Sequence, residues 1–404
     1  MRPLRRLLDN VEPYFARGGP LHRFHALYEA LDTFLYTPGE ITRGAPHVRD
    51  AVDLKRVMIS VVLAVSPALI IGVWNTGFQA NTAMAALGTE AIPGWRGALI
   101  GLFGLGYDPA GVLDCFIHGL VYFLPILVVT FTVGIAWEIL FAAIRNHEVN
   151  EGFFVTSFLY ALILPATTPL WQVALGISFG VVIAKEVFGG TGKNFVNPAL
   201  AGRAFLYFAY PIQMSGTAVW VPVDGFSGAT ALGISALDGM AGIAAQGITW
   251  TQAFAGQMQG SIGEVSAVAC LIGGLILMYT RVASWRIIAG VFAGMVITTL
   301  LFNAIGSDTN PMFAMPWYWH LVLGGFAFGM VFMATDPVSA CQTNNGRWVF
   351  GLLVGFLTVT IRVANPAFPE GIMLAILFAN VMAPLIDWFV VRANVRRRLR
   401  RNVA

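Results

Sequence analysis

Residues 117–143 read IHGLVYFLPILVVTFTVGIAWEILFAA, an apolar run in which Glu138 is the one acidic residue. A helix needs about 20 mostly apolar residues to cross the hydrocarbon core of a bilayer, so this stretch is long enough to span it. The whole chain is 57% hydrophobic and 11% charged, whereas soluble domains carry about 25% charged residues. We therefore expect an all-α polytopic membrane protein.

Further apolar stretches are candidates for the same role and bring the total to about ten transmembrane helices. Prolines shorten or interrupt two of them, 153–169 and 199–212. The remaining candidates are 57–74, 171–188, 264–280, 286–303, 317–334, 348–364 and 372–391.

Basic residues predict the orientation, because loops rich in Lys and Arg stay in the cytoplasm. Arginines cluster in the polar region 1–56 and in the tail 392–404, so we predict that both are cytoplasmic and that 57–391 form the membrane domain. Apolar pairs within 1–56 are consistent with short amphipathic helices or with a solvated basic tail. Arg96 is the one basic residue in the predicted outside loops. The basic residues of the predicted inside loops are Arg145, Lys185, Lys193, Arg203, Arg281, Arg286 and Arg347.

On this topology, residues from about 213 to 263 form an exterior loop. The run from Ala204 to Thr280 contains no Lys or Arg, as an exported segment should. The sequence DGFSGAT occupies 224–230, and the small residues before Thr230 leave its hydroxyl open to a bulky group. Both an ordinary turn and a site of modification outside the membrane fit this pattern.

A weak internal repeat relates 171–180 to 320–329. Each segment is followed by a polar stretch, 189–197 or 335–346, and then by another candidate span. Symmetric halves with interrupted helices commonly place a ligand or an ion path where the halves meet. Close packing of glycine-rich helices without a pore is the alternative.

The polar stretch GGTGKN at 189–194 does not qualify as a phosphate loop, because Asn194 stands where Ser or Thr should hold magnesium. The loop from Asn194 to Pro198 could hold a heteroaromatic ring, or it could be an ordinary turn between helices. The three scattered cysteines show no metal-binding spacing. Among the six histidines, His22 and His25 alone have the spacing of helical metal ligands, but they lie in the polar tail and we assign them no metal.

Ionisable residues inside apolar runs are costly and usually functional. Glu138 and Asp387 lie in such runs, and their carboxylates suit Na⁺ or H⁺, so both are candidates for an ion path. Lys185, Glu186 and Arg362 lie nearer the ends of their spans, and we expect them to extend to the membrane surface.

The stretch at 224–230 resembles the flavinylation motif of the membrane subunits shared by sodium-translocating NADH:quinone reductases and Rnf complexes. Further matches to this family lie at 137–138, 150–154, 185–198 and 383–387. The resemblance implies that Thr230 carries FMN through a phosphoester formed by a flavin transferase on the periplasmic face. Asp224, Ser227, Gly228 and Ala229 form the rest of the motif.

The resemblance also implies a complex with five other subunits in the bacterial inner membrane. Such a complex oxidises NADH on another subunit, reduces ubiquinone and exports Na⁺. Electrons would pass from the partner's FMN to the covalent FMN, then to non-covalent riboflavin, for which Asn194 and Asn197 are candidate contacts, and then to ubiquinone. Gly134 matches a quinone-binding position, and Ile135 stands where relatives often have a second glycine.

Two alternatives remain at this stage. The first is the Rnf counterpart, but the long polar region 1–56 resembles that of the sodium-pump branch of the family more than the shorter Rnf counterpart. The second is a passive channel or permease, which the repeat and the interrupted helices would also suit.

Overall fold

The computed structural model describes residues 2–15, 18–21, 28, 32, 54–104, 106–145, 152–216, 219–223, 228–365 and 370–402. The regular structure of these residues is helical, without a strand, as the sequence predicts. Among them, six helices are long and apolar enough to cross a membrane. The chain is therefore an all-α polytopic membrane protein.

Each expected span coincides with one or more helices, although several of these helices are shorter than a bilayer requires. The number of ten spans thus stays a prediction. The helices at the expected spans are α3 (Leu54–Leu87), α5 (Val112–Arg145), α6 (Gly152–Leu162), α7 (Leu170–Ser178), α8 (Pro198–Ala209), α12 (Ala267–Tyr279), α13 (Trp285–Ile305), α14 (Trp317–Val322), α15 (Phe326–Phe328), α16 (Asn344–Ala364) and α17 (Ile372–Asn402). The other α-helices are α1 (Arg2–Phe15), α4 (Trp95–Leu102), α9 (Pro211–Met214), α10 (Ala231–Ala245) and α11 (Trp250–Ala255).

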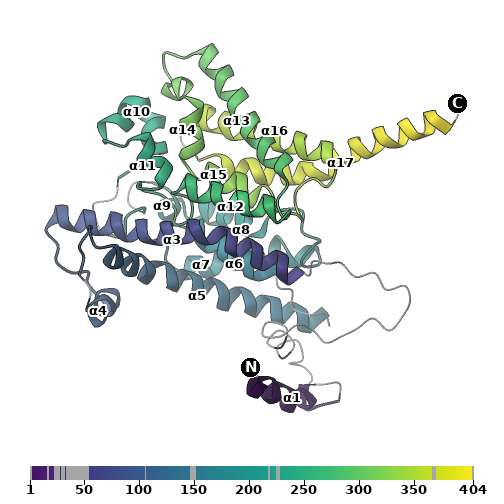
Figure 1. Ribbon diagram of the computed structural model, residues 1–404, viewed down its shortest axis with the longest axis horizontal. Helices are drawn as coiled ribbons and strands as arrows, with labels where there is room; N and C mark the ends of the chain where they lie inside the picture. The colour runs from purple at the N-terminus through teal and green to yellow at the C-terminus, as the bar shows by residue number, and fades with distance from the viewer. Residues whose placement is uncertain are drawn as a thin grey trace.

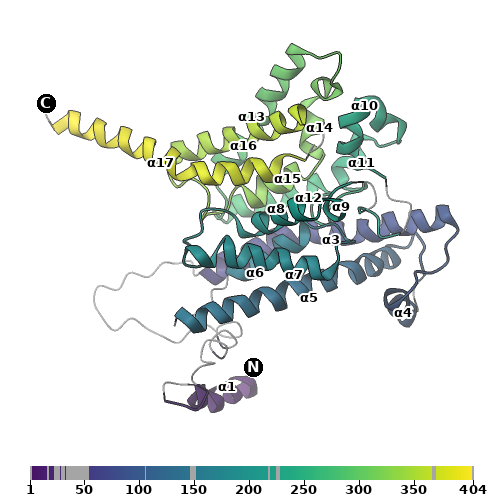
Figure 2. The same cartoon turned by 180° about the vertical axis from the view of Figure 1, so that it is seen from behind.

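The long helices form two groups, and α12 packs against α3 of the first group and against α15. In the first group α3 packs against α5, and α6 and α7 pack against α5 on the side seen in Figure 2. In the second group α16 packs against both α13 and α17. Helices α10 and α11, which follow Thr230, lie at the end of the molecule away from the projecting C-terminal tip of α17 (Figure 1).

The two repeated segments have the same interrupted local structure. Helix α7 continues into a π-helical turn at Phe179–Ile183, and α15 continues into another at Gly329–Met333. A polar stretch follows each turn, and the next helix begins at a side-chain cap, Asn197 for α8 and Thr343 for α16. Because π-helical turns are frequent at functional sites, the repeats indicate where a ligand site should lie.

The expectation that Lys185, Glu186 and Arg362 extend to the membrane surface is wrong. Their exposed fractions are 2%, 1% and 0%. Arg203, counted above as a charge of an inside loop, is likewise inside α8 and 4% exposed. Their burial is tolerated because each has ionic or carbonyl partners inside the protein.

Candidate functional site

A cavity that we call the Thr230 cavity lies at the start of α10. It holds about 350 Å³ of empty space, counting its open mouth. Thr230 is the N-cap of α10, and its Oγ1 accepts a hydrogen bond from the Gly233 N–H at 3.1 Å. Threonine is well suited to this position because its hydroxyl satisfies an otherwise unpaired helix N–H. The lining residues are Trp220, Thr230, Ala231, Leu232, Met258, Gln259, Gly260, Ser261, Glu264, Val265, Leu323, Gly324, Gly325 and Glu370.

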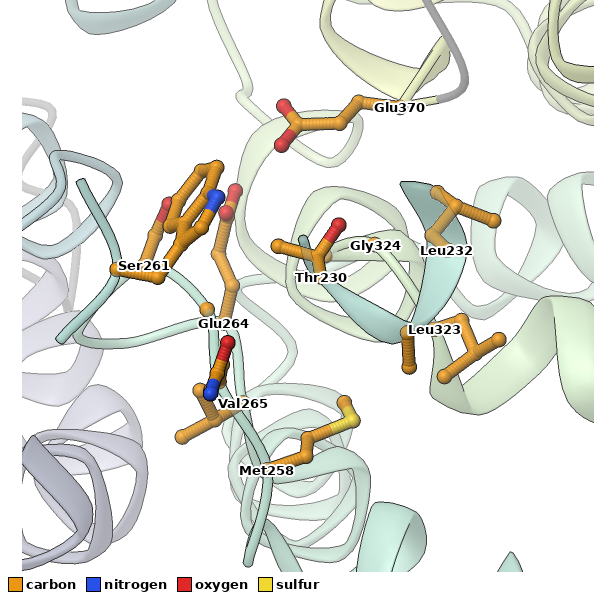
Figure 3. Close-up of a pocket in the computed structure, with 14 residues that line it drawn as sticks. Thr230, Leu232, Met258, Ser261, Glu264, Val265, Leu323, Gly324 and Glu370 are labelled. Carbon is orange, nitrogen blue, oxygen red and sulfur yellow. The ribbon is translucent and has the colours of Figure 1, made fainter. Parts of the chain in front are cut away.

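Two carboxylates, those of Glu264 and Glu370, line this cavity beside Thr230 (Figure 3). Arg203 pairs with both: its Nη1 lies 2.8 Å from Glu264 Oε1 and its Nη2 lies 3.0 Å from Glu370 Oε2. The same Nη2 donates to Ser261 Oγ at 3.3 Å. One buried cation thus compensates part of the negative charge beside the threonine hydroxyl.

A second buried arginine, Arg362, supports the part of the cavity wall formed by Leu323, Gly324 and Gly325. Arg362 donates to the carbonyl oxygens of His320 at 2.8 Å and of Leu323 at 2.7 Å, where the chain unwinds between α14 and α15. Gly324 and Gly325 in this unwound stretch have φ near +65°, a conformation that favours glycine. Arg362 therefore takes up carbonyl groups that no helix satisfies, and it holds the wall in place.

The stretch 224–230 is described only in part. Asp224 and Ser227 lie outside the described residues, whereas Gly228, Ala229 and Thr230 are half-buried. Among the described residues, a Cβ at Gly228 would meet Gln259 Oε1 at 3.8 Å, an ordinary contact distance. The open hydroxyl of Thr230 and the attachment of a flavin to it stay predictions.

A larger cavity lies where the two repeats meet, and we call it the repeat-interface cavity. It holds about 800 Å³ of empty space, counting its open mouth. The first repeat contributes Lys185, Thr191, Asn194, Asn197 and Pro198, and the second contributes Phe332, Thr335, Asp336, Pro337 and Val338. Apolar residues of α3, α6 and α12 complete the wall.

Polar groups of both repeats converge on this cavity. The Asn197 Nδ2 donates to Asp336 Oδ2 at 3.5 Å, while its Oδ1 caps α8. Asn194 donates to the Val196 carbonyl at 3.0 Å. In the part of the chain that the structure describes, the buried Thr191 hydroxyl has no hydrogen-bond partner. Burial raises the pKa of the Asp336 carboxyl above its usual value.

Glu138 is connected to the repeat-interface cavity through an ion pair. Its Oε1 accepts from Lys185 Nζ, and Lys185 lines the cavity. Asp387 lies elsewhere and lines neither cavity. Its carboxylate accepts from the N–H groups of Gln342 and Thr343 at 2.6 and 3.0 Å, which holds the turn before α16. The two predicted ion-path residues are thus not brought together.

Gly134 and Ile135 also lie outside the linings of both cavities. A Cβ at Gly134 would overlap the ring of Phe153, so this glycine allows α6 to pack closely on α5. Ile135 is half-buried against the core. Quinone binding at these residues stays a prediction.

Sequence reasoning missed Arg203, Glu264 and Glu370 as parts of a site. The first two are 61 residues apart and Arg203 is 167 residues from Glu370. The sequence did offer a signal, because all three are charged residues in glycine-rich, apolar surroundings. Charged residues in such surroundings are usually paired and functional.

Comparison with known proteins identifies the family of this chain. The model of the NQR2, RnfD, RnfE family matches residues 41–396. The chain belongs to this family. It is 63% identical to a protein of Ectopseudomonas mendocina (strain ymp) over 99% of this chain and 100% of that relative. It is 62% identical to a protein of Stutzerimonas stutzeri (strain A1501), again over 99% and 100%.

A third relative, from Azotobacter vinelandii, is 61% identical over 99% of this chain and 100% of its own length. All three family members are named as the B subunit of a Na(+)-translocating NADH-quinone reductase. Their similarity extends beyond the part of the chain that the family model matches, into the polar N-terminal region.

Proposed function

We propose that this chain is the B subunit of a Na⁺-translocating NADH-quinone reductase, an enzyme complex that acts as a translocase. The observation that carries this function is an identity of 61–63% with proteins of that name over essentially the whole chain. The match includes the N-terminal region, which favours the sodium pump over the Rnf counterpart. It also favours a redox subunit over a passive channel.

FMN bound through a phosphoester at Thr230 is the first proposed cofactor of the subunit. Flavin supplies electron-transfer chemistry that amino-acid side chains lack. Thr230 offers the esterified oxygen at the start of α10, where helix N–H groups favour a negatively charged phosphate. Arg203 offsets the two nearby carboxylates, which limits repulsion of that phosphate.

Riboflavin in the repeat-interface cavity is the second proposed cofactor. Asn194 and Asn197 supply amide donors and acceptors, and the unpartnered hydroxyl of Thr191 offers another polar contact. The apolar residues of α3, α6 and α12 exclude water from a planar ring. Ubiquinone as substrate, near Gly134 and Ile135, and Na⁺ as transported ion, along Glu138 and Asp387, complete the proposal.

The proposed setting is the bacterial inner membrane, with both termini in the cytoplasm and the Thr230 loop in the periplasm. Five other subunits assemble with this one, and NADH binds to another of them. A flavin transferase acts on Thr230 from the periplasmic side.

Replacement of Thr230, the proposed attachment residue for FMN, tests whether this chain is a flavin-carrying redox subunit. In Thr230→Val we expect an unmodified subunit, loss of ubiquinone reduction, and retained NADH oxidation by an artificial acceptor. The measurement is the mass of the Thr230 peptide together with both activities of the purified complex. Chymotrypsin is the suitable protease, because trypsin has no site between Ala204 and Thr280.

The matched control is Thr249→Val, which removes the N-cap hydroxyl of α11 in the same loop. It should retain the flavin, as should Thr230→Ser, which keeps a hydroxyl. Two results would show that Thr230 does not carry FMN. One is an unmodified wild-type peptide from cells with their own maturation machinery, and the other is full activity of Thr230→Val.

A further inference from the structure

Three arginines line a third cavity, which we call the arginine cleft. It holds about 910 Å³ of empty space, counting its open mouth. Arg281 follows α12, Arg286 belongs to the first turn of α13, and Arg347 belongs to the first turn of α16. The cleft adjoins the repeat-interface cavity, because both are lined by Val282, Thr335, Asp336 and Pro337.

Within the part of the chain that the structure describes, the positive charge of the cleft is not balanced by ion pairs. Among the described residues, none of these three arginines forms a salt bridge. Asp336 also lines the cleft, but it pairs with none of the three arginines. Its carboxylate instead accepts hydrogen bonds from the Val338 N–H at 3.0 Å and from Ser339 Oγ at 2.8 Å. Arg347 Nε donates to the Cys341 carbonyl at 3.2 Å. The other guanidinium N–H groups of the three arginines have no hydrogen-bond partner among the described residues and are available to an anionic ligand, and forked guanidinium groups suit phosphate oxygens.

Further donors lie beside the arginines. Ser284 is the N-cap of α13, yet it makes no capping hydrogen bond, and its buried hydroxyl has no partner among the described residues. The first N–H groups of this 21-residue helix also open toward an anion at its N-terminus. Arg281 has φ 60°, unlike every other described non-glycine residue, and such backbone strain tends to gather at ligand sites.

The surroundings of the cleft favour a lipid over free phosphate. Trp285 and Trp348 lie beside it with their rings perpendicular and 5.5 Å apart, and tryptophan marks membrane interfaces. On α16, Val349 at 49%, Leu352 at 37% and Phe356 at 45% are exposed, on the side of the helix opposite Arg347. They give α16 an apolar surface of the kind that faces a bilayer, so the cleft lies at the end of a membrane-facing helix.

We propose that the arginine cleft binds the phosphate of an anionic phospholipid. Basic pockets between transmembrane helices are established sites for such headgroups. A bound headgroup covers the side of the repeat-interface cavity formed by Thr335, Asp336 and Pro337. This site is independent of any flavin chemistry.

Native mass spectrometry of the delipidated, detergent-solubilised complex tests the site, with dioleoyl-phosphatidylglycerol and dioleoyl-phosphatidylcholine as probes. Wild type should bind phosphatidylglycerol preferentially. The variant with Arg281→Gln, Arg286→Gln and Arg347→Gln should bind it at least about tenfold more weakly, since each arginine contributes to the attraction. The matched control removes equal charge from the exposed end of α17, through Arg396→Gln, Arg397→Gln and Arg400→Gln, and should bind like wild type.

A variant with lysine at the same three cleft positions keeps the charges that orient the chain but loses the forked geometry. We expect it to assemble and to show a reduced preference for phosphatidylglycerol. If the glutamine variant fails to assemble, the lysine variant therefore still tests whether the cleft binds the lipid. Unchanged preference in either variant overturns the proposal. If inorganic phosphate alone displaces phosphatidylglycerol, the cleft is a site for free phosphate and the proposal of a lipid ligand is wrong.

Discussion

Glu138 and Lys185 form a buried ion pair between α5 and the segment that follows α7, and each side chain is 3% exposed. Removal of one partner from such a buried pair costs about 3–5 kcal/mol. Replacement of both by apolar side chains can be nearly neutral. The pair thus has a structural role that must be separated from any role in ion transport.

We expect Glu138→Gln or Lys185→Met alone to lower the melting temperature of the purified complex, and the combination of Glu138→Leu with Lys185→Met to restore most of it. Na⁺ dependence of turnover is the second measurement. If Glu138 belongs to the ion path, the stable double variant still responds weakly to Na⁺. A double variant with normal stability and a normal Na⁺ response would remove Glu138 from the path. Asp9→Asn, which breaks an exposed pair with Arg5, is the control and should change neither.

Among the helices, the close approach of α5 and α6 depends on Gly134. The ring of Phe153 on α6 occupies the space that a side chain at Gly134 on α5 would need. Forcing an extra methyl group into a packed interior costs about 1–3 kcal/mol, because neighbouring side chains must leave their preferred rotamers. The glycine therefore contributes to the packing of α5 on α6, whether or not quinone binds nearby.

We predict that Gly134→Ala lowers the melting temperature of the complex and that adding Phe153→Leu recovers much of the loss. The KM for ubiquinone distinguishes the two roles of Gly134. A raised KM in both the single and the double variant supports a quinone site at this position. Recovery of stability together with a wild-type KM in the double variant would assign Gly134 to packing alone.

Across the molecule as a whole, the Thr230 region and the end of α17 lie at opposite ends of the long helices (Figures 1 and 2). This arrangement suits the predicted topology, in which they face opposite sides of the membrane. The cysteines Cys115, Cys270 and Cys341 are all buried, at 0%, 0% and 1% exposure. A new surface cysteine can therefore be labelled with little background.

We expect a membrane-impermeant maleimide to label Gln246→Cys in intact spheroplasts but to label Arg400→Cys only after the membrane is opened. Both positions are exposed in the structure, so access differs only by the side of the membrane. Equal labelling after permeabilisation is the control. Labelling of Arg400→Cys in intact spheroplasts would reverse the predicted topology.

Local sequence was enough to establish the membrane class, the approximate helices, the interrupted repeat and the family. These features depend on local composition and order: apolar runs predict helices in a bilayer, and polar stretches after 171–180 and 320–329 predict the interruptions. The motif ending at Thr230 was likewise visible as a short string. Its role as a flavin anchor stays a prediction.

The pairing of charged groups and the positions of the cavities became visible only in the folded chain. Lys185 and Arg362 were expected at the membrane surface, yet Lys185 pairs with Glu138 and Arg362 bonds to carbonyls of an unwound segment. The free energy of a buried charge depends on its partners, and those partners are far away in the chain. Local sequence shows the charged residue but not its partner. The ion pairs of Arg203 with Glu264 and Glu370, and the arginine cleft, are therefore visible only in the packed helices.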